Sequence, residues 1–199
     1  DADTFRTRLA DNLALQNVIM TKALGGEALR EKAILDEYMA YADRLRPYVA
    51  DTAGIIHEAL DAGKRITFEG AQGSLLDLDH GTYPFVTSSQ TVAGGVCGGA
   101  GVGPKDIDGV IGIVKAYLTR VGEGPLPTAE SAALDETLRQ AGGEFGATTG
   151  RPRRCGWLDA VQLRRAVQLN GATGIFLTKC DVLDNLDTIK IAVAYELDG

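Results

Sequence analysis

Apolar residues follow a helical period through the first third of the chain. From Ile34 to Leu45 they recur three and four positions apart, which predicts an amphipathic helix. Pro47 favours a break after that helix, and the period resumes from Val49 to Leu60 before a stop signal. Together with a helix predicted over Thr4 to Lys22, this pattern indicates a helical segment at the amino end, residues 1–63.

The pattern changes after residue 63, where short extended runs replace the helical period. Three runs predict strands, and the second and third, rich in Val and Ile, are expected to be buried: Arg65–Glu69, Gly109–Tyr117 and Gly174–Thr178. Helical spacing returns over residues 157–170. This order predicts an α/β core over residues 64–199, with a mostly parallel central sheet flanked by helices. Ligands bind such sheets at the carboxyl ends of the strands, where the polar loops of this chain fall.

Composition narrows the class of protein. The 199 residues are 45% hydrophobic and 24% charged, as in an ordinary globular domain. No apolar run approaches the roughly 20 residues that span a bilayer, so no membrane partner is expected. The net charge of −7 excludes a nucleic-acid binder held by overall charge. Three cysteines, Cys97, Cys155 and Cys180, argue against a disulfide scaffold and fit a reducing, cytoplasmic compartment, and we interpret the last two as packing residues.

Two polar loops follow the first predicted strand. The first places Gln72 among glycines, where its amide could read a purine edge by donating and accepting at once; the alternative is a tight turn with an exposed glutamine. Close behind it, a structural polar network is favoured over a metal site for Asp77, Asp79 and His80. The second loop, Thr87–Thr91, runs into a glycine-rich stretch that could cradle a phosphate or simply connect elements, and it lacks the ending of a Walker A motif.

Two later loops carry charge. Residues 146–154 hold three arginines and two threonine hydroxyls, a set that suits carboxylates or phosphates. A solvated basic turn is the alternative, whereas a nucleic-acid patch would need interleaved aromatic residues. At the end of the third predicted strand, Thr178-Lys179-Cys180-Asp181 resembles the guanine-recognition element of GTP-binding proteins, with a chance match as the alternative. In that element the Asp carboxylate accepts from the base and the Lys stem covers its plane.

Together these segments resemble the adenylosuccinate synthetase family. The resemblance covers essentially the whole chain in six ordered motifs: Phe68–Gly73 with Asp77–Pro84, Val86–Ser89, Lys115–Tyr117 with Thr119–Pro125, Glu144–Arg151, Gly156–Asp159 and Thr178–Asp184. It implies the P-loop-NTPase-like fold of that family. It also implies that residues 1–199 form the central part of a single domain, about the middle half of the family's length, with the amino- and carboxyl-terminal parts absent.

The resemblance implies a ligase of AMP biosynthesis. In the family, GTP phosphorylates the 6-oxygen of IMP in the presence of Mg²⁺. The amine of L-aspartate then displaces that phosphate to give adenylosuccinate, GDP and phosphate. Such chemistry depends mainly on positioning and charge stabilisation. IMP, L-aspartate and GTP are therefore the expected ligands, and a cytoplasmic homodimer is the expected form.

The same motifs carry the family's site residues onto this chain. The resemblance assigns IMP to Gln72 at the hypoxanthine edge, to Thr87 at the 5′-phosphate, to Val121 near the ribose and to Arg151. It assigns aspartate to a mobile loop formed by Ala147, Thr148, Thr149, Gly150, Arg151, Pro152 and Arg153. It assigns GTP to Arg153, on the nucleotide side of that loop, and to Lys179, Cys180 and Asp181 at the guanine base.

The family's catalytic machinery has no counterpart in this sequence. The phosphate loop, catalytic aspartate and catalytic histidine of the family's amino-terminal part are unmatched, as is the carboxyl-terminal part of its guanine pocket. No catalytic or metal-binding residue is therefore assigned here, Mg²⁺ ligands are expected elsewhere, and residues 1–199 alone are expected to be inactive. Two alternatives stay open: a stand-alone nucleotide-binding or interaction module without catalysis, and a fold-level GTPase relative that uses Lys179 and Asp181 as a switch.

Overall fold

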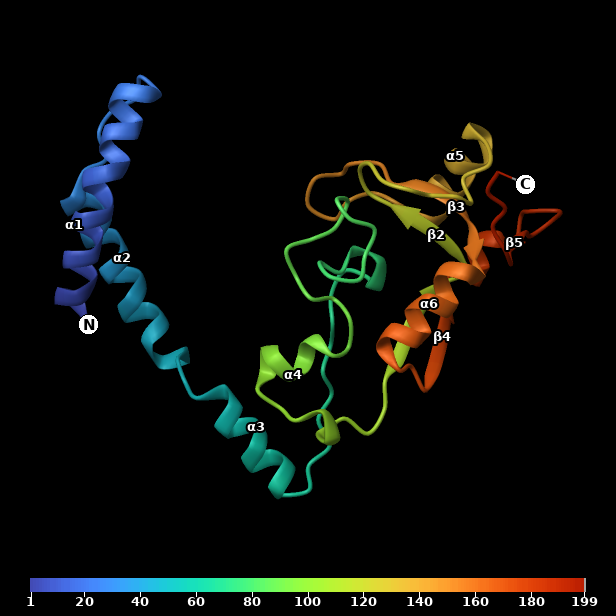
Figure 1. The fold of residues 1–199 in the computed structure, drawn as a ribbon, viewed down its shortest axis with the longest axis horizontal. Helices are drawn as coiled ribbons and strands as arrows, with labels where there is room; N and C mark the ends of the chain where they lie inside the picture. The colour runs from blue at the N-terminus through green and yellow to red at the C-terminus, as the bar shows by residue number, and fades with distance from the viewer. Residues whose placement is uncertain (199) are drawn as a thin grey trace. The chain divides into compact units, whose positions relative to one another are not determined.

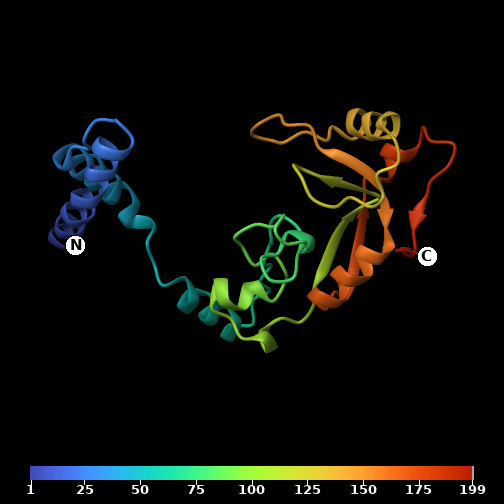
Figure 2. The same cartoon turned by 45° about the horizontal axis from the view of Figure 1, so that its top comes forward.

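The computed structural model describes residues 1–198, which fall into two compact units. The first unit comprises Asp1–Thr52, and the second begins at Ala53. Figure 1 and Figure 2 show that the first unit consists of helices and their connections, whereas the second combines helices with strands.

The first unit is a pair of helices packed against each other. Its elements are α1 (Ala2–Val18), the π-helical turn η1 (Ile19–Ala23), α2 (Glu31–Leu45) and the 3₁₀ turn η2 (Arg46–Tyr48). The rings of Phe5 and Tyr38 stack between α1 and α2 with their centroids 6.3 Å apart. Asn17 fixes the connection, because its side chain bonds both the N–H and the carbonyl of Leu29. Both helices form where the sequence predicts them, and Pro47 lies at the expected break.

The second unit contains two small sheets with helices beside them. Its elements are α3 (Thr52–Asp61), η3 (Ser74–Leu76), α4 (Gly95–Ala100), η4 (Pro104–Asp106), β1 (Ile111–Lys115), β2 (Tyr117–Arg120), α5 (Ala132–Gly142), β3 (Arg154–Asp159), α6 (Ala160–Asn170), β4 (Gly174–Thr178), η5 (Cys180–Leu183) and β5 (Ile191–Ala192). β1 pairs with β4 in parallel, while β3 pairs antiparallel with β2 and parallel with β5. In both views α6 runs beside β4 (Figure 1, Figure 2). The fold is thus α/β with mostly parallel pairing, as predicted, but its strands are divided between two sheets.

The core lies where β2 and β3 meet α5 and η5. It is formed by the buried side chains of Ala116, Tyr117, Leu138, Cys155, Val182 and Leu183. Cys155 packs there as expected, whereas Cys180 is exposed, so its interpretation as a packing residue is wrong. The N–H of Ala116 donates to the carbonyl of Thr178 at 2.9 Å. This bond ties the end of β1 to the end of β4 directly beside the core.

Three predicted elements have different bounds in the structure. Residues 65–69 form no strand, because no neighbouring strand within residues 1–198 pairs with them. The run over residues 109–117 is interrupted at Ala116, after which the chain enters the other sheet as β2. The helix expected from residue 157 begins at Ala160, because the preceding residues complete β3 and the Asp159 carboxylate caps the helix.

The β1–β4 pair is not buried, which corrects the expectation drawn from its Val and Ile content. Ile113 and Phe176 lie opposite each other, and their exposed fractions are 71% and 64%. Parallel sheets are ordinarily covered on both faces. Nothing within residues 1–198 covers these two side chains, so the apolar pattern predicted strands correctly and burial wrongly.

Candidate functional site

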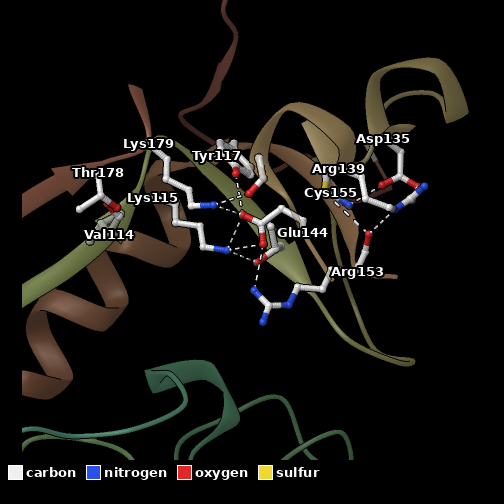
Figure 3. A network of polar contacts seen from close by, with 12 residues as sticks. Val114, Lys115, Tyr117, Asp135, Arg139, Glu144, Arg153, Cys155, Thr178 and Lys179 are labelled. Atoms are coloured by element: carbon white, nitrogen blue, oxygen red, sulfur yellow. Dashed lines mark hydrogen bonds and ion pairs between the residues drawn. The ribbon is translucent and has the colours of Figure 1, made fainter. Parts of the chain in front are cut away.

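One buried carboxylate gathers cations from three parts of the chain, as Figure 3 shows. Glu144, just after α5, has a side chain only 1% exposed, and Lys115 Nζ lies 2.7 Å from its Oε2. Arg153 Nη1 lies 2.9 Å from the same oxygen, and Lys179 Nζ lies 3.3 Å from Oε1. The Tyr117 hydroxyl donates to Oε1 at 2.5 Å. We call these five residues the Glu144 cluster. Because three cations face one carboxylate, the cluster has an excess of positive charge.

The cluster sets the pKa values of its members. Burial alone would raise the pKa of Glu144, but hydrogen bonds from Lys115, Tyr117 and Lys179 lower it to about 2. Burial lowers the pKa of Lys115, and the neighbouring Glu144 carboxylate opposes that change. Burial and the same carboxylate raise the pKa of Tyr117, which keeps its hydroxyl a donor. Glu144 is therefore an anion throughout the neutral pH range.

The Glu144 cluster lies at the carboxyl ends of β1 and β4. Lys115 is the last residue of β1, and Lys179 directly follows β4. Lys179 has a φ of 57°, a left-handed conformation that is uncommon outside glycine and that gathers at functional sites. Its Nζ also donates to the carbonyl of Gly142. Cys180 and Asp181, the other members of the predicted guanine element, are exposed beside it.

The predicted aspartate loop starts and ends at this cluster. Its neck is closed where the carbonyl of Glu144 accepts from the N–H of Arg153 at 3.0 Å and where Phe145 pairs with Pro152. The ion pair between the side chains of Glu144 and Arg153 is a further contact across this neck. Beyond the neck the loop is exposed, and it comprises Ala147, Thr148, Thr149, Gly150, Arg151 and Pro152.

A surface hollow of about 440 Å³ lies beside the loop and is lined by Gly122, Glu123, Gly124, Arg151, Pro152 and Arg154. Gly122 and Gly124 have φ values of 73° and 105°, which only glycine adopts easily. The Arg154 guanidinium bonds their carbonyls at 3.1 and 2.7 Å. The Arg151 guanidinium has no hydrogen bond or ion pair within residues 1–198. The hollow therefore places Arg151, a predicted IMP contact, beside the turn that follows Val121, which is another.

The other two predicted IMP residues lie in the loop region between α3 and α4. Gln72 is exposed and has a φ of 64°, so its backbone is held in a left-handed turn. The Thr87 hydroxyl lies 3.0 Å from the carbonyl of Leu76 and is already bonded to backbone. Arg120, at the end of β2, bonds the carbonyl of Phe85 at 2.8 Å. That bond holds the Thr87 loop to the strand that leads into Val121.

A structural polar network also forms where the sequence favours one. Asp77 is fully buried, and its carboxylate accepts from the N–H groups of Asp79, His80, Thr91 and Val92 at 2.6 to 3.2 Å. Burial opposes ionisation, but these four bonds lower the pKa of Asp77 overall. Asp77 therefore holds together the loop region that carries Thr87.

Sequence reasoning missed three members of the Glu144 cluster. Lys115, Tyr117 and Glu144 lie within the quoted motifs but were given no role there. The position of Lys115 near the carboxyl end of the strand predicted over residues 109–117 was a usable signal. The burial of Glu144 was not, because an isolated acidic residue before a basic loop is ordinarily exposed.

Comparison with known proteins shows the family to which this chain is related. A sequence model described as adenylosuccinate synthetase matches residues 1–199. This chain belongs to the adenylosuccinate synthetase family. The adenylosuccinate synthetase of Geobacter sulfurreducens is 57% identical over 199 residues, which are 100% of this chain and 46% of that protein. The one from Thermodesulfovibrio yellowstonii is 54% identical over 194 residues, 98% of this chain and 46% of its own length.

Solved structures agree on the adenylosuccinate synthetase fold. The fully ligated adenylosuccinate synthetase of Plasmodium falciparum superimposes with a TM-score of 0.85 at 36% identity, over 95% of this chain and 44% of that one. The succinoaminodeoxyadenylate synthetase of cyanophage S-2L matches with a TM-score of 0.52 at 26% identity, over 63% of this chain and 38% of that one. The chain thus spans about half the length of the relatives it matches. None of the helices within residues 1–198 has the length and apolarity that crossing a membrane would take.

Proposed function

We propose that this chain is the central part of an enzyme that ligates IMP and L-aspartate at the cost of GTP. In the first step the γ-phosphoryl group of GTP is transferred to the 6-oxygen of IMP and GDP leaves. In the second step the amine of aspartate attacks the purine carbon that carries this oxygen, and the oxygen leaves as part of the released phosphate. The observation that carries the proposal is the family match over all of residues 1–199, at 57% identity to the Geobacter sulfurreducens enzyme.

The loops of this chain would bind and orient the three substrates. The free guanidinium of Arg151 and the hydroxyls of Thr148 and Thr149 are exposed on one loop, where they suit the carboxylates of aspartate. The adjoining hollow, with the turn after Val121, would accept the IMP ribose. Gln72 and Thr87 would contact the hypoxanthine edge and the 5′-phosphate.

GTP would lie where β1 and β4 end. Asp181 is exposed and would accept from the guanine N1–H and amine, while Lys179 would cover the base. The excess positive charge of the Glu144 cluster, which includes Arg153, favours an anionic ligand at this end of the strands. Cys180 would contribute backbone beside the base, as its exposed position allows.

Residues 1–198 do not fit the Mg²⁺ that the family implies. No group of three or more His, Cys, Asp or Glu within them could hold a metal ion. The ligands of the metal are therefore expected outside residues 1–198. The homodimer and the cytoplasmic location remain expectations from the family.

A chimera tests the proposed function. Residues 1–199 replace the matching segment of the Geobacter sulfurreducens enzyme, and the purified chimera is assayed for adenylosuccinate formed from IMP, aspartate and GTP. We expect activity from the chimera and none from residues 1–199 alone. A folded chimera that forms no adenylosuccinate overturns the proposal. Activity of residues 1–199 alone would contradict the expected dependence on the rest of the enzyme.

The alternative is a nucleotide-binding module without catalysis, and the same proteins decide between the two. A module would bind GDP or IMP as residues 1–199 alone, which calorimetry can measure, and would leave the chimera inactive. The exposed Asp181 and the free Arg151 favour binding in either case, so the activity of the chimera is the deciding result.

A further inference from the structure

The Glu144 side chain joins two loops that the proposed function gives to different substrates. Arg153 belongs to the loop assigned to aspartate, and Lys179 belongs to the element assigned to guanine. Their cations lie 2.9 and 3.3 Å from the two oxygens of the same carboxylate. The side chain of Glu144 is 1% exposed, so it is too deeply buried to contact a substrate itself.

Glu144 contributes to the orientation of both cations. The Nε of Arg153 is buried and has no hydrogen-bond partner, so the ion pair through Nη1 is what fixes its guanidinium. Lys179 has the carbonyl of Gly142 as its other partner. Lys115, which bonds both Glu144 oxygens and the Thr119 hydroxyl, also holds the carboxylate in place. Removal of the negative charge would leave three cations facing one another, and they would separate.

We propose that Glu144 is a positioning residue that fixes the positions of Arg153 and Lys179 relative to each other. One buried carboxylate then orients both the aspartate loop and the guanine element. This inference rests on the proposed function, because that function gives the two loops their substrates. It predicts a linked effect on aspartate and GTP. IMP should be affected least, because Gln72 and Thr87 lie in a region held by Asp77 and Arg120, and of its assigned contacts only Arg151 belongs to the loop whose neck Glu144 closes.

The test is steady-state kinetics on the chimera with Glu144→Gln, which keeps the size of the side chain and removes its charge. We expect the KM for aspartate and the KM for GTP each to rise roughly tenfold, the loss that one hydrogen bond to a charged group accounts for. The KM for IMP should change less than about twofold. Glu136→Gln is the matched control, since Glu136 also pairs with an arginine but is 55% exposed on α5. It should leave all three KM values unchanged.

A double variant separates positioning from simple loss of structure. If Glu144 acts on aspartate through Arg153, adding Glu144→Gln to Arg153→Ala should raise the KM for aspartate no further, whereas independent effects would multiply. Equal damage to all three KM values in Glu144→Gln, or a multiplied effect in the double variant, overturns the inference. Should Glu144→Gln not fold, Glu144→Asp keeps the charge but shortens its reach, and the same pattern is expected at smaller size.

Tryptic cleavage provides a readout that does not depend on catalysis. The neck of the loop contains Arg153, and the loss of its ion pair should speed cleavage after Arg153 several-fold relative to the Glu136→Gln protein. An unchanged cleavage rate overturns the inference even if the chimera is inactive. An inactive wild-type chimera with accelerated cleavage in Glu144→Gln would contradict only the proposed function.

Discussion

Arg151 and Arg153 lie two residues apart, yet their guanidinium groups are bound to different degrees. Arg153 is held against the buried Glu144 at 2.9 Å, whereas Arg151 is exposed and has no partner within residues 1–198. A fixed cation suits a role in shaping a site, and a free one at the edge of a hollow suits direct contact with an anion. The two arginines should therefore respond differently to substitution.

Arg151→Leu in the chimera should impair the use of aspartate far more than the use of GTP. The loss of a charged hydrogen-bond partner for a carboxylate costs roughly 1.5–3 kcal/mol, at least tenfold in the KM for aspartate. Kinetics with each substrate varied in turn measures the effect, and Arg8→Leu, at an exposed arginine of α1, is the matched control. An unchanged KM for aspartate together with an unchanged kcat would contradict the assignment.

Asp181→Asn should change the choice of base. An amide N–H would face the guanine amine, so GTP should weaken roughly tenfold or more. Xanthosine triphosphate has a carbonyl at that position and should become the better donor. The kinetic constants of both nucleotides decide the question, with Asp187→Asn as the control at a nearby exposed aspartate. Wild-type use of GTP by the variant would show that Asp181 does not read guanine.

At the scale of elements, periodic patterns predicted the helices, which depend on local interactions. They failed for a strand whose formation depends on residues distant in the sequence. The spacing in α2, α3 and α6 is a property of consecutive residues, and α2 has nearly the predicted bounds. By contrast, Arg65–Glu69 has a strand-like composition but forms no strand, since a strand needs a partner that sequence spacing does not reveal. For the same reason residue types single out the loops of the candidate site in the sequence, whereas the burial of Glu144 depends on packing and could not be predicted.

The start of α6 is set by one side chain, which gives a stability prediction. Asp159 is fully buried, and its Oδ1 accepts from the N–H groups of Val161 and Gln162 at 3.0 Å each. Asp159→Ala should lower the free energy of unfolding by about 0.5–2 kcal/mol. Asp159→Asn keeps an acceptor oxygen and should cost less. Urea denaturation followed by circular dichroism compares the two, and equal losses would show that the cap contributes nothing.

At the scale of the whole molecule, the Glu144 cluster ties the stability of the second unit to pH. The pKa of Glu144 is about 2 in the folded chain, below its ordinary value of about 4.3 in an unfolded one. The stabilisation is therefore fully present above about pH 4.3 and is lost as the pH falls towards 2. A protonated glutamic acid resembles glutamine, so wild type and Glu144→Gln should differ most near neutral pH.

Urea denaturation across this pH range measures that difference. The gap in the free energy of unfolding between the two proteins should narrow steadily from pH 5 to pH 2. A gap that stays constant over this interval would mean that the charge of Glu144 does not contribute to folding. Glu136→Gln again serves as the control, because its exposed ion pair should show little dependence on pH.

The uncovered β1–β4 pair has a consequence for the exchange of amide hydrogens with solvent. Within the described residues each of its strands bonds a single neighbour, and its apolar side chains, such as Ile113 and Phe176, face water. Local opening of this pair therefore exposes little further apolar surface and should be frequent, whereas β2 and β3 open only with the core around Tyr117 and Leu138. In deuterated water, residues 1–199 alone should lose the β1 and β4 protons first. The same protons should persist in the chimera if the rest of the enzyme covers these strands.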